Sequence, residues 1–129
     1  CRILIPGHNN TTALAIASIS AAGASADSIN VTVNASDVAA IDTAKTGANA
    51  GAVTVAGDVS DGAFHDIRAS WQTNNLDAKT EAGRATPDTS VDPPVALDTI
   101  DIGQTVAAAG QPGAIIQSLK IFPRPQLRR

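Results

Sequence analysis

Aromatic and sulfur-containing side chains are scarce in this sequence of 129 residues. It holds two Phe, one Trp, no Tyr and no Met, and its single Cys is residue 1. One cysteine excludes both an internal disulfide and a zinc site built from several cysteine ligands. The shortage of aromatic residues argues against a deep aromatic-lined ligand pocket, because such pockets are lined largely by these side chains.

Charge is also sparse. Charged residues make up 16% of the chain and the formal net charge is −3, so the basic surface expected of a nucleic-acid-binding protein is missing. The sequence also lacks the charge density of a solvated tail or a coiled coil. No apolar run reaches the roughly 18 residues needed to span a bilayer. We therefore expect no nucleic-acid partner and no membrane association.

Small residues dominate what is present, with 25 Ala and 10 Gly among the 129 residues. An apolar content of Ala with Val, Ile and Leu predicts thin, closely packed layers, and the length predicts a single domain over 1–129. The first residue, Cys1, leaves three readings open: the C-terminal part of a longer chain, a processed protein, or a lipoprotein. The first two are favoured, since an apolar strand segment follows at once where a lipoprotein has a polar spacer.

Alternation of apolar and polar residues predicts strands along most of the chain. Ile29, Val31 and Val33 alternate with polar residues in the clearest example, a pattern typical of a half-buried strand. Turn residues separate the segments, and no convincing helix is present. The sequence predicts an all-β antiparallel β-sandwich. Its expected strands are 2–5, 14–17, 28–34, 38–43, 53–55, 64–71, 76–81, 97–102 and 115–122, with small-residue loops at 21–27, 45–51 and 104–113.

Three segments together resemble the laminin-G-like, concanavalin A-like jelly-roll domains. DGAFHDIRASW, residues 61–71, is similar to a recurrent strand of the family, with Phe64 where the family has its first Trp. LDTIDIG, residues 97–103, follows as a second strand motif. GAIIQSLKIFPRPQL, residues 113–127, is similar to the closing strand, and its Pro-Arg ending is a form associated with phage virion and tail-associated members.

The resemblance implies a jelly-roll sandwich and a role in a phage particle. It favours a non-enzymatic structural or surface protein of the virion, either capsid decoration or tail-associated. Such a protein would be located in the virion or outside the cell, with copies of itself and other virion proteins as partners. The alternative is a lectin-like carbohydrate-binding module for attachment to the host or another cell surface, with Asn-rich loops at 9–10 and 74–75.

Four carboxylates cluster in the sequence between residues 86 and 101. Calcium prefers such hard oxygen ligands, and the resemblance adds that laminin-G-like relatives often bind calcium along one sandwich edge. The alternative is that these aspartates cap turns and solubilise strands. The candidate calcium ligands are Asp88, Asp92, Asp98 and Asp101.

The sequence contains no recognisable arrangement of catalytic residues. His8 and His65 are the two histidines, and His65 is expected to be a surface or hydrogen-bonded strand residue, not a metal ligand. Without a nucleophile elbow or a Ser-His-Asp context, we expect no enzyme activity.

Two further expectations concern packing. Trp71 shares a strand face with Ile67 and Ala69, so we expect it to supply much of the core. Edge strands with few Lys or Glu side chains invite pairing with another chain. The segment from Arg2 to Ile5 carries no acidic residue and is expected to add to a neighbour's sheet or to continue into a further part of the protein, in a many-copy assembly.

Overall fold

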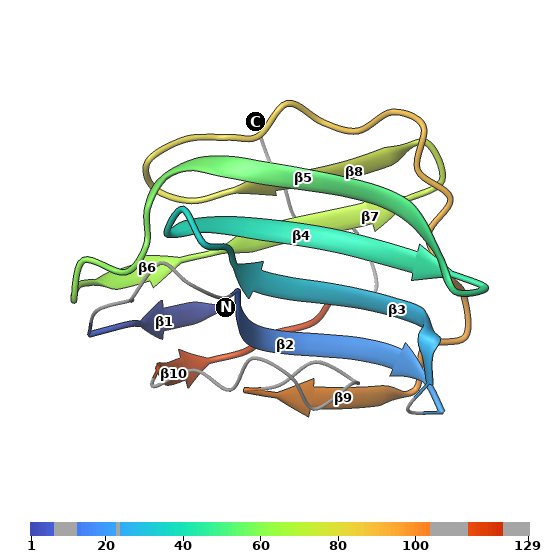
Figure 1. Ribbon diagram of the computed structural model, residues 1–129, viewed down its shortest axis with the longest axis horizontal. Coiled ribbons are helices and arrows are strands. Elements are labelled where there is room, and N and C mark those ends of the chain that lie inside the picture. The colour runs from blue at the N-terminus through green and yellow to red at the C-terminus, as the bar shows by residue number, and fades with distance from the viewer. Residues whose placement is uncertain (7–12, 23, 104–113, 123–129) are drawn as a thin grey trace.

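The computed structural model describes residues 1–6, 13–22, 24–103 and 114–122. Every regular element in these ranges is a strand, in two layers (Figure 1). No helix among them is long and apolar enough to cross a membrane. In chain order the strands are β1 (Arg2–Leu4), β2 (Leu14–Ala21), β3 (Ala24–Val33), β4 (Val38–Lys45), β5 (Ala48–Asp58), β6 (Phe64–Asp66), β7 (Arg68–Gln72), β8 (Asn75–Lys79), β9 (Thr99–Ile102) and β10 (Ile115–Ser118).

The first layer is a five-stranded antiparallel sheet in the order β5-β4-β3-β2-β9. Its inner face follows the alternation of the sequence, because Ile29, Val31 and Val33 of β3 all point towards the second layer. In the register Val31 lies opposite Ile41 of β4 and Ala17 of β2. The polar residues between them occupy the outer face.

The second layer combines two smaller sheets, β10-β1-β6 and β7-β8. They join at Ile67, which separates β6 from β7 and whose amide donates to the carbonyl oxygen of Cys1 at 2.8 Å. Ile3 and Ile5 on the β1 side and Leu76 on β8 are each 1% exposed or less. These side chains pack against the first layer in one hydrophobic core, so the two small sheets act as one face of the sandwich.

One long edge of the sandwich is covered by residues 84–92, which we call the crossing segment. Leu76 of β8 forms a bridge with Asp88, and the Asp92 amide donates to the carbonyl oxygen of Ala50 at 3.2 Å. The crossing segment therefore links β8 in one layer to β5 in the other (Figure 1). Val91 near its end is fully buried against Gly51 of β5.

The predicted fold class is confirmed, and each of the nine expected strands overlaps an observed strand. Two of the expected loops are wrong: β3 already begins at Ala24, and β5 begins at Ala48 immediately after a short turn from β4. The third, at 104–113, lies outside the described residues. The expectation that residues 2–5 add to a neighbour's sheet is also wrong, because β1 is paired on both edges, with β10 and β6.

Candidate functional site

The edge opposite the crossing segment exposes apolar side chains. β9 is the outer strand of the first layer and β10 the outer strand of the second, and both lie along the same side of the molecule (Figure 1). We call β9, β10 and the continuation to Phe122 the open rim. Among the described residues it holds five of the seven large apolar side chains that are exposed, namely Ile100 (49%), Ile102 (58%), Ile115 (57%), Ile121 and Phe122.

The register explains why the β9 isoleucines are exposed. Ile100 lies opposite Ile19 of β2, and Ile102 lies opposite Ala17, so both isoleucines point to the inner face of the sheet. Inner-face side chains are buried only where the second layer covers them, and the described part of that layer ends before it reaches β9. Within the part of the chain that the structure describes, the open rim is therefore an apolar surface without a protein cover.

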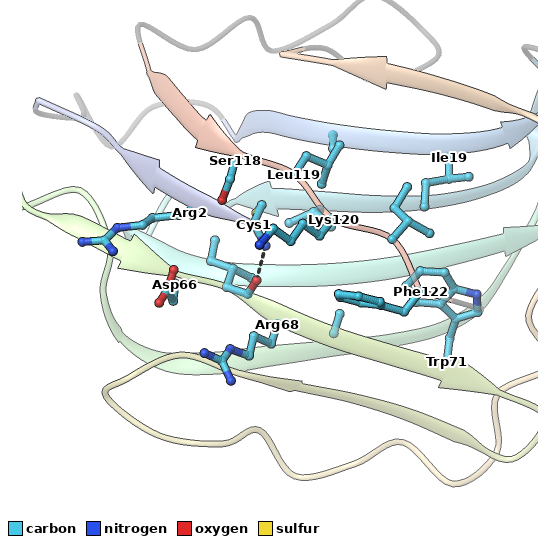
Figure 2. Close-up of a pocket in the computed structure, with 15 residues that line it drawn as sticks. Cys1, Arg2, Ile19, Asp66, Arg68, Trp71, Ser118, Leu119, Lys120 and Phe122 are labelled. Carbon is cyan, nitrogen blue, oxygen red and sulfur yellow. Dashed lines mark hydrogen bonds between the residues drawn. The ribbon is translucent and has the colours of Figure 1, made fainter. Parts of the chain in front are cut away.

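A cleft of about 520 Å³ opens between the two layers next to the open rim. Its floor is formed by Ala17, Ile19 and Val31 of the first sheet, and Ile19 and Val31 are only half-buried. β7 forms one wall and the residues after β10 form the other (Figure 2). Cys1 lies at one end of this cleft, while Trp71 and Phe122 lie close together at the other end (Figure 2).

Trp71 points inward as predicted, but it is not a fully buried core residue. It packs against the core cluster from the side and is only half-buried, because the cleft lies beside it. The predicted side-chain direction is confirmed; the predicted degree of burial is wrong.

Basic side chains predominate at the mouth of the cleft. Arg2, Arg68 and Lys120 contribute three cationic groups to its lining, and Asp66 is the one carboxylate there. All three basic residues are exposed. The mouth is therefore positively charged in a chain whose overall charge is negative.

Asp88 and Asp92 lie along the edge formed by β5. The Asp88 carboxylate accepts hydrogen bonds from the Ser90 amide and hydroxyl at 2.9 and 2.8 Å, and from the Ala52 amide at 3.3 Å. These bonds, those from Ser90 first, hold the pKa of Asp88 below its usual value. Asp92 forms an exposed ion pair with Lys45 at 2.7 Å.

Asp98 and Asp101 lie at the other edge of the same sheet. Asp98 accepts a hydrogen bond from the Ala22 amide at 2.6 Å, which is the main reason why the pKa of Asp98 is lowered. Asp101 lies opposite Ser18 of β2. β5 and β9 are separated by four interstrand spacings, or about 19 Å at ~4.8 Å each.

The four predicted calcium ligands are therefore not brought together. Calcium ligands lie roughly 2.3–2.6 Å from the ion, so one ion cannot join the two edges. Among the described residues no group of three or more His, Cys, Asp or Glu side chains is placed to hold a metal. The contacts of Asp88 and Asp98 instead fit the alternative, in which these carboxylates cap turns, and calcium binding by this chain stays a prediction.

His65 forms a polar cluster that the sequence pattern did not reveal. It is buried on the inner side of β6, while its neighbour Phe64 is exposed, with the Arg2 guanidinium 5.3 Å from the ring centre. The imidazole Nε2 lies 2.8 Å from Asp61 Oδ1, and Nδ1 is hydrogen-bonded to Glu81. The prediction of a hydrogen-bonded strand histidine is confirmed, whereas His8 lies outside the described residues.

The pKa values in this cluster favour a charged histidine. Burial acts to lower the pKa of His65, but the hydrogen bonds and charges of Asp61 and Glu81 outweigh it and raise the pKa above its usual 6.5. The pKa of Asp61 is lowered, first by its hydrogen bond with His65. Burial acts to raise the pKa of Glu81, but hydrogen bonds from backbone amides and from His65 bring it below its usual value.

We expect the His65 cluster to make folding stability depend on pH. A raised histidine pKa stabilises the fold fully below about pH 6.5, and this contribution is lost as the pH rises through the folded value. The lowered pKa values of Asp61 and Glu81 have the opposite pH dependence, so the stability that these two carboxylates contribute is lost only in acid. The free energy of unfolding, measured in urea, should therefore fall less between pH 5.5 and pH 8.5 in His65→Gln than in the native chain. An equal loss in both proteins would contradict this.

A polar row crosses the outer face of the five-stranded sheet. Ser18 Oγ donates to Asn30 Oδ1 at 2.7 Å, and Asn30 Nδ2 donates to Asp42 Oδ2 at 2.9 Å. Asp101 lies beside Ser18 in the register, so the row runs over β9, β2, β3 and β4. Alternation in the sequence predicted polar residues here, although not which of them would contact one another.

Comparison with known proteins supports the fold. No family model matches the chain, and no curated protein matches it by sequence. Among solved structures, a similar one is the mouse laminin alpha1 chain, domains LG4-5, with a TM-score of 0.63 and 12% sequence identity. The similarity covers 81% of this chain and 27% of that chain, so the chain spans about a quarter of that structure's length. The chain thus has a laminin G-like jelly-roll fold.

Proposed function

We propose that this chain is a non-enzymatic structural and surface protein of a phage virion, on the capsid or the tail. It works through contacts with copies of itself and with other virion proteins. The observation that carries the protein-contact part is the open rim, where Ile100, Ile102 and Ile115 are each about half exposed or more. Clustered apolar side chains of this kind mark interaction surfaces. The assignment to a phage particle is supported by the Pro-Arg ending of the closing strand motif.

Association through the open rim is expected to depend on Ile100 and Ile102. Replacing both with Lys should convert an oligomer into a monomer in light scattering, because apolar contact is replaced by charge repulsion across the interface. Both side chains are about half exposed, so their Lys stems can reach water and the fold should persist. A specific interface should bury more than about 1,000 Å² in total.

Val95→Lys is the matched control. Val95 is 78% exposed but belongs to the connection before β9, outside the open rim, so the substitution places one Lys, half the added charge of the double variant, elsewhere on the surface. It should leave the oligomeric state unchanged. A native chain that is strictly monomeric at high concentration would argue against the proposal.

The alternative function is a lectin-like carbohydrate-binding module. The polar row favours it, because amide and carboxylate groups such as those of the half-buried Asn30, Asp42 and Asp101 can bind sugar hydroxyls, whereas Ser18 in the same row is fully buried. Of the predicted Asn-rich loops, Asn74 lies in the exposed turn between β7 and β8 and Asn75 begins β8, whereas residues 9–10 lie outside the described residues. A monomeric native chain that is retained on immobilised cell-surface glycans would favour this alternative.

A further inference from the structure

His65 joins two separate connections of the chain at one point of the second layer. Its side chain lies on the inner side of β6 and the residue is 8% exposed. Nε2 lies 2.8 Å from Oδ1 of Asp61, in the connection between β5 and β6, and Nδ1 is hydrogen-bonded to Oε1 of Glu81, which follows β8. One imidazole ring therefore links two segments that lie far apart in the sequence.

This link requires a proton on each ring nitrogen. An imidazole donates from both nitrogens only as the cation, whereas the neutral ring has one donor and one lone pair. The pKa of Asp61 is lowered first by its hydrogen bond with His65, and at Glu81 hydrogen bonds outweigh the effect of burial and lower the pKa as well. Both carboxylates thus stay ionised when the ring loses a proton, and one of them then faces a lone pair and has to move away.

Asp61 is the carboxylate that can leave with the smaller loss of hydrogen bonds. Its Oδ1 also accepts the Ala63 amide at 2.8 Å, but this bond lies within the same connection and moves with it. Glu81 holds β6 with both of its oxygens, because Oε2 accepts the Asp66 amide at 3.1 Å. The neutral ring should therefore keep its proton on Nδ1, where it donates to Glu81.

The segment that would move with Asp61 consists of residues 61–63. All three are exposed, and the Gly62 amide also holds the segment to β1 by donating to the carbonyl oxygen of Ile5 at 3.1 Å. Just before the segment, the Val59 amide is bound to a carbonyl oxygen in the turn between β3 and β4 at 2.8 Å. An opening would consequently begin after Val59, and the Gly62 amide would report it.

The charged groups of β1 and β6 are directed away from the ring. β1 lies beside β6 and places the apolar Ile3 opposite His65 in the register. Arg2 lies opposite Asp66, and both belong to the other face of the sheet, because successive side chains of a strand alternate. The Arg2 guanidinium contacts the ring of Phe64 on that outer face.

The charged groups at the end of β5 and after Glu81 have partners of their own. The Asp58 carboxylate accepts the Ser60 amide and hydroxyl at 2.7 and 3.1 Å, and Arg84 is bound to Asp77. Burial alone would lower the pKa of His65, but the hydrogen bonds and charges of its two carboxylate partners raise it above 6.5. The proton that holds the link is therefore lost only above that pH.

We propose that His65 is a pH-operated latch, which opens residues 61–63 when the ring loses a proton. In the closed state the imidazolium holds Asp61 and Glu81 at the same time. In the open state the Nε2 proton has passed to water, the neutral ring keeps Glu81 through Nδ1–H, and the Asp61 carboxylate is hydrated. The latch is closed below about pH 6.5 and opens as the pH rises through the folded value. It does not depend on the proposed function, because it acts at β6 and not at the open rim.

Two NMR measurements on the native chain test the latch, from acid to the pH at which the His65 ring is neutral. The nitrogen-15 shifts of the ring should show that Nε2 becomes the unprotonated nitrogen while Nδ1 keeps its proton. Hydrogen exchange of the Gly62 amide should show the opening. After correction for the intrinsic rise of exchange with pH, its protection should fall by roughly five-fold, the effect of losing one hydrogen bond, with the midpoint of the His65 titration.

Glu81→Gln is the variant that separates the latch from a structural role of His65. Its side-chain amide can donate to an unprotonated Nδ1, so the neutral ring can keep its proton on Nε2 and hold Asp61. The protection of Gly62 should then stay constant as His65 titrates, and Nδ1 should become the unprotonated nitrogen. Asp58→Asn is the matched control, since it removes a nearby carboxylate that is bound to Ser60, and it should behave as the native chain does.

Four results would overturn the proposal. These are a His65 ring that is neutral throughout, loss of the native proton from Nδ1, Gly62 protection that stays constant while the native ring titrates, and an equal fall in the native chain and Glu81→Gln. The light-scattering test of Ile100 and Ile102 is read separately. A monomeric chain therefore leaves the latch in place, and constant Gly62 protection leaves the open rim in place as an interface.

Discussion

Leu76→Ala is expected to lower the free energy of unfolding by about 2–5 kcal/mol, the range for truncating a buried leucine in a well-packed core. Leu76 is 0% exposed and lies on the inner face of β8, opposite Trp71 of β7 in the second layer. The substitution leaves a cavity that the strands around it cannot close. Equilibrium unfolding in urea measures the loss.

Trp71→Ala provides the matched comparison, because Trp71 lies directly opposite Leu76 in the β7–β8 pairing and on the same face. A fully buried tryptophan would cost roughly 3–5 kcal/mol to truncate, as the sequence alone led us to expect. Since Trp71 is half-buried beside the cleft, its loss should cost less than that of Leu76. A larger loss for Trp71→Ala than for Leu76→Ala would show that the cleft is closed in solution.

Gly51→Val should be the second strongly destabilising substitution. A Cβ atom at Gly51 would lie 2.4 Å from Cγ2 and 2.8 Å from Cβ of Val91, and both distances are far below van der Waals contact. Overpacking of this kind costs roughly 1–3 kcal/mol, occasionally more. The crossing segment would have to move away from β5, and Asp88 with it, because its Oδ2 is 3.2 Å from the same position.

A compensating substitution at Val91 and a control substitution at another glycine complete the test of Gly51→Val. Val91→Ala in the Gly51→Val background removes the atom in closest contact and should recover part of the melting temperature, although it destabilises the native chain. Gly83→Val is the control, because nothing lies within 4 Å of its Cβ position. It should change the free energy of unfolding by less than about 0.5 kcal/mol. Equal losses at Gly51 and Gly83 would contradict the close packing of β5 against the crossing segment.

Strands with large β-branched residues were predictable from the sequence, because their alternation with polar residues indicates which side chains face the core. The alternation around Ile29, Val31 and Val33 placed the inner face of β3 correctly. Ala24 and Ala48 gave no such signal, since alanine fits a loop as well as a strand. Their strand conformation follows from pairing with neighbouring strands, which a local pattern does not contain.

Which residues come together in the candidate sites depends on strand order, and strand order cannot be predicted from local sequence patterns. Asp88, Asp92, Asp98 and Asp101 are neighbours in sequence, but the chain between them passes from the β5 edge to the β9 edge. Ile100 and Ile102 were placed on a strand correctly, yet their exposure results from β9 being an outer strand. The cleft required knowledge that β1 ends opposite Ile67, a pairing between residues 66 positions apart.

One covered edge and one open edge determine what kinds of assembly the sandwich can build. With the β5 edge occupied by the crossing segment, a contact between two open rims gives a two-fold symmetric pair and then stops. A ring, shell or tube needs a head-to-tail contact, in which one surface of a subunit meets a different surface of the next. Any large particle built from this chain must therefore use a second surface besides the open rim. The contacts made through that second surface determine the symmetry of the particle.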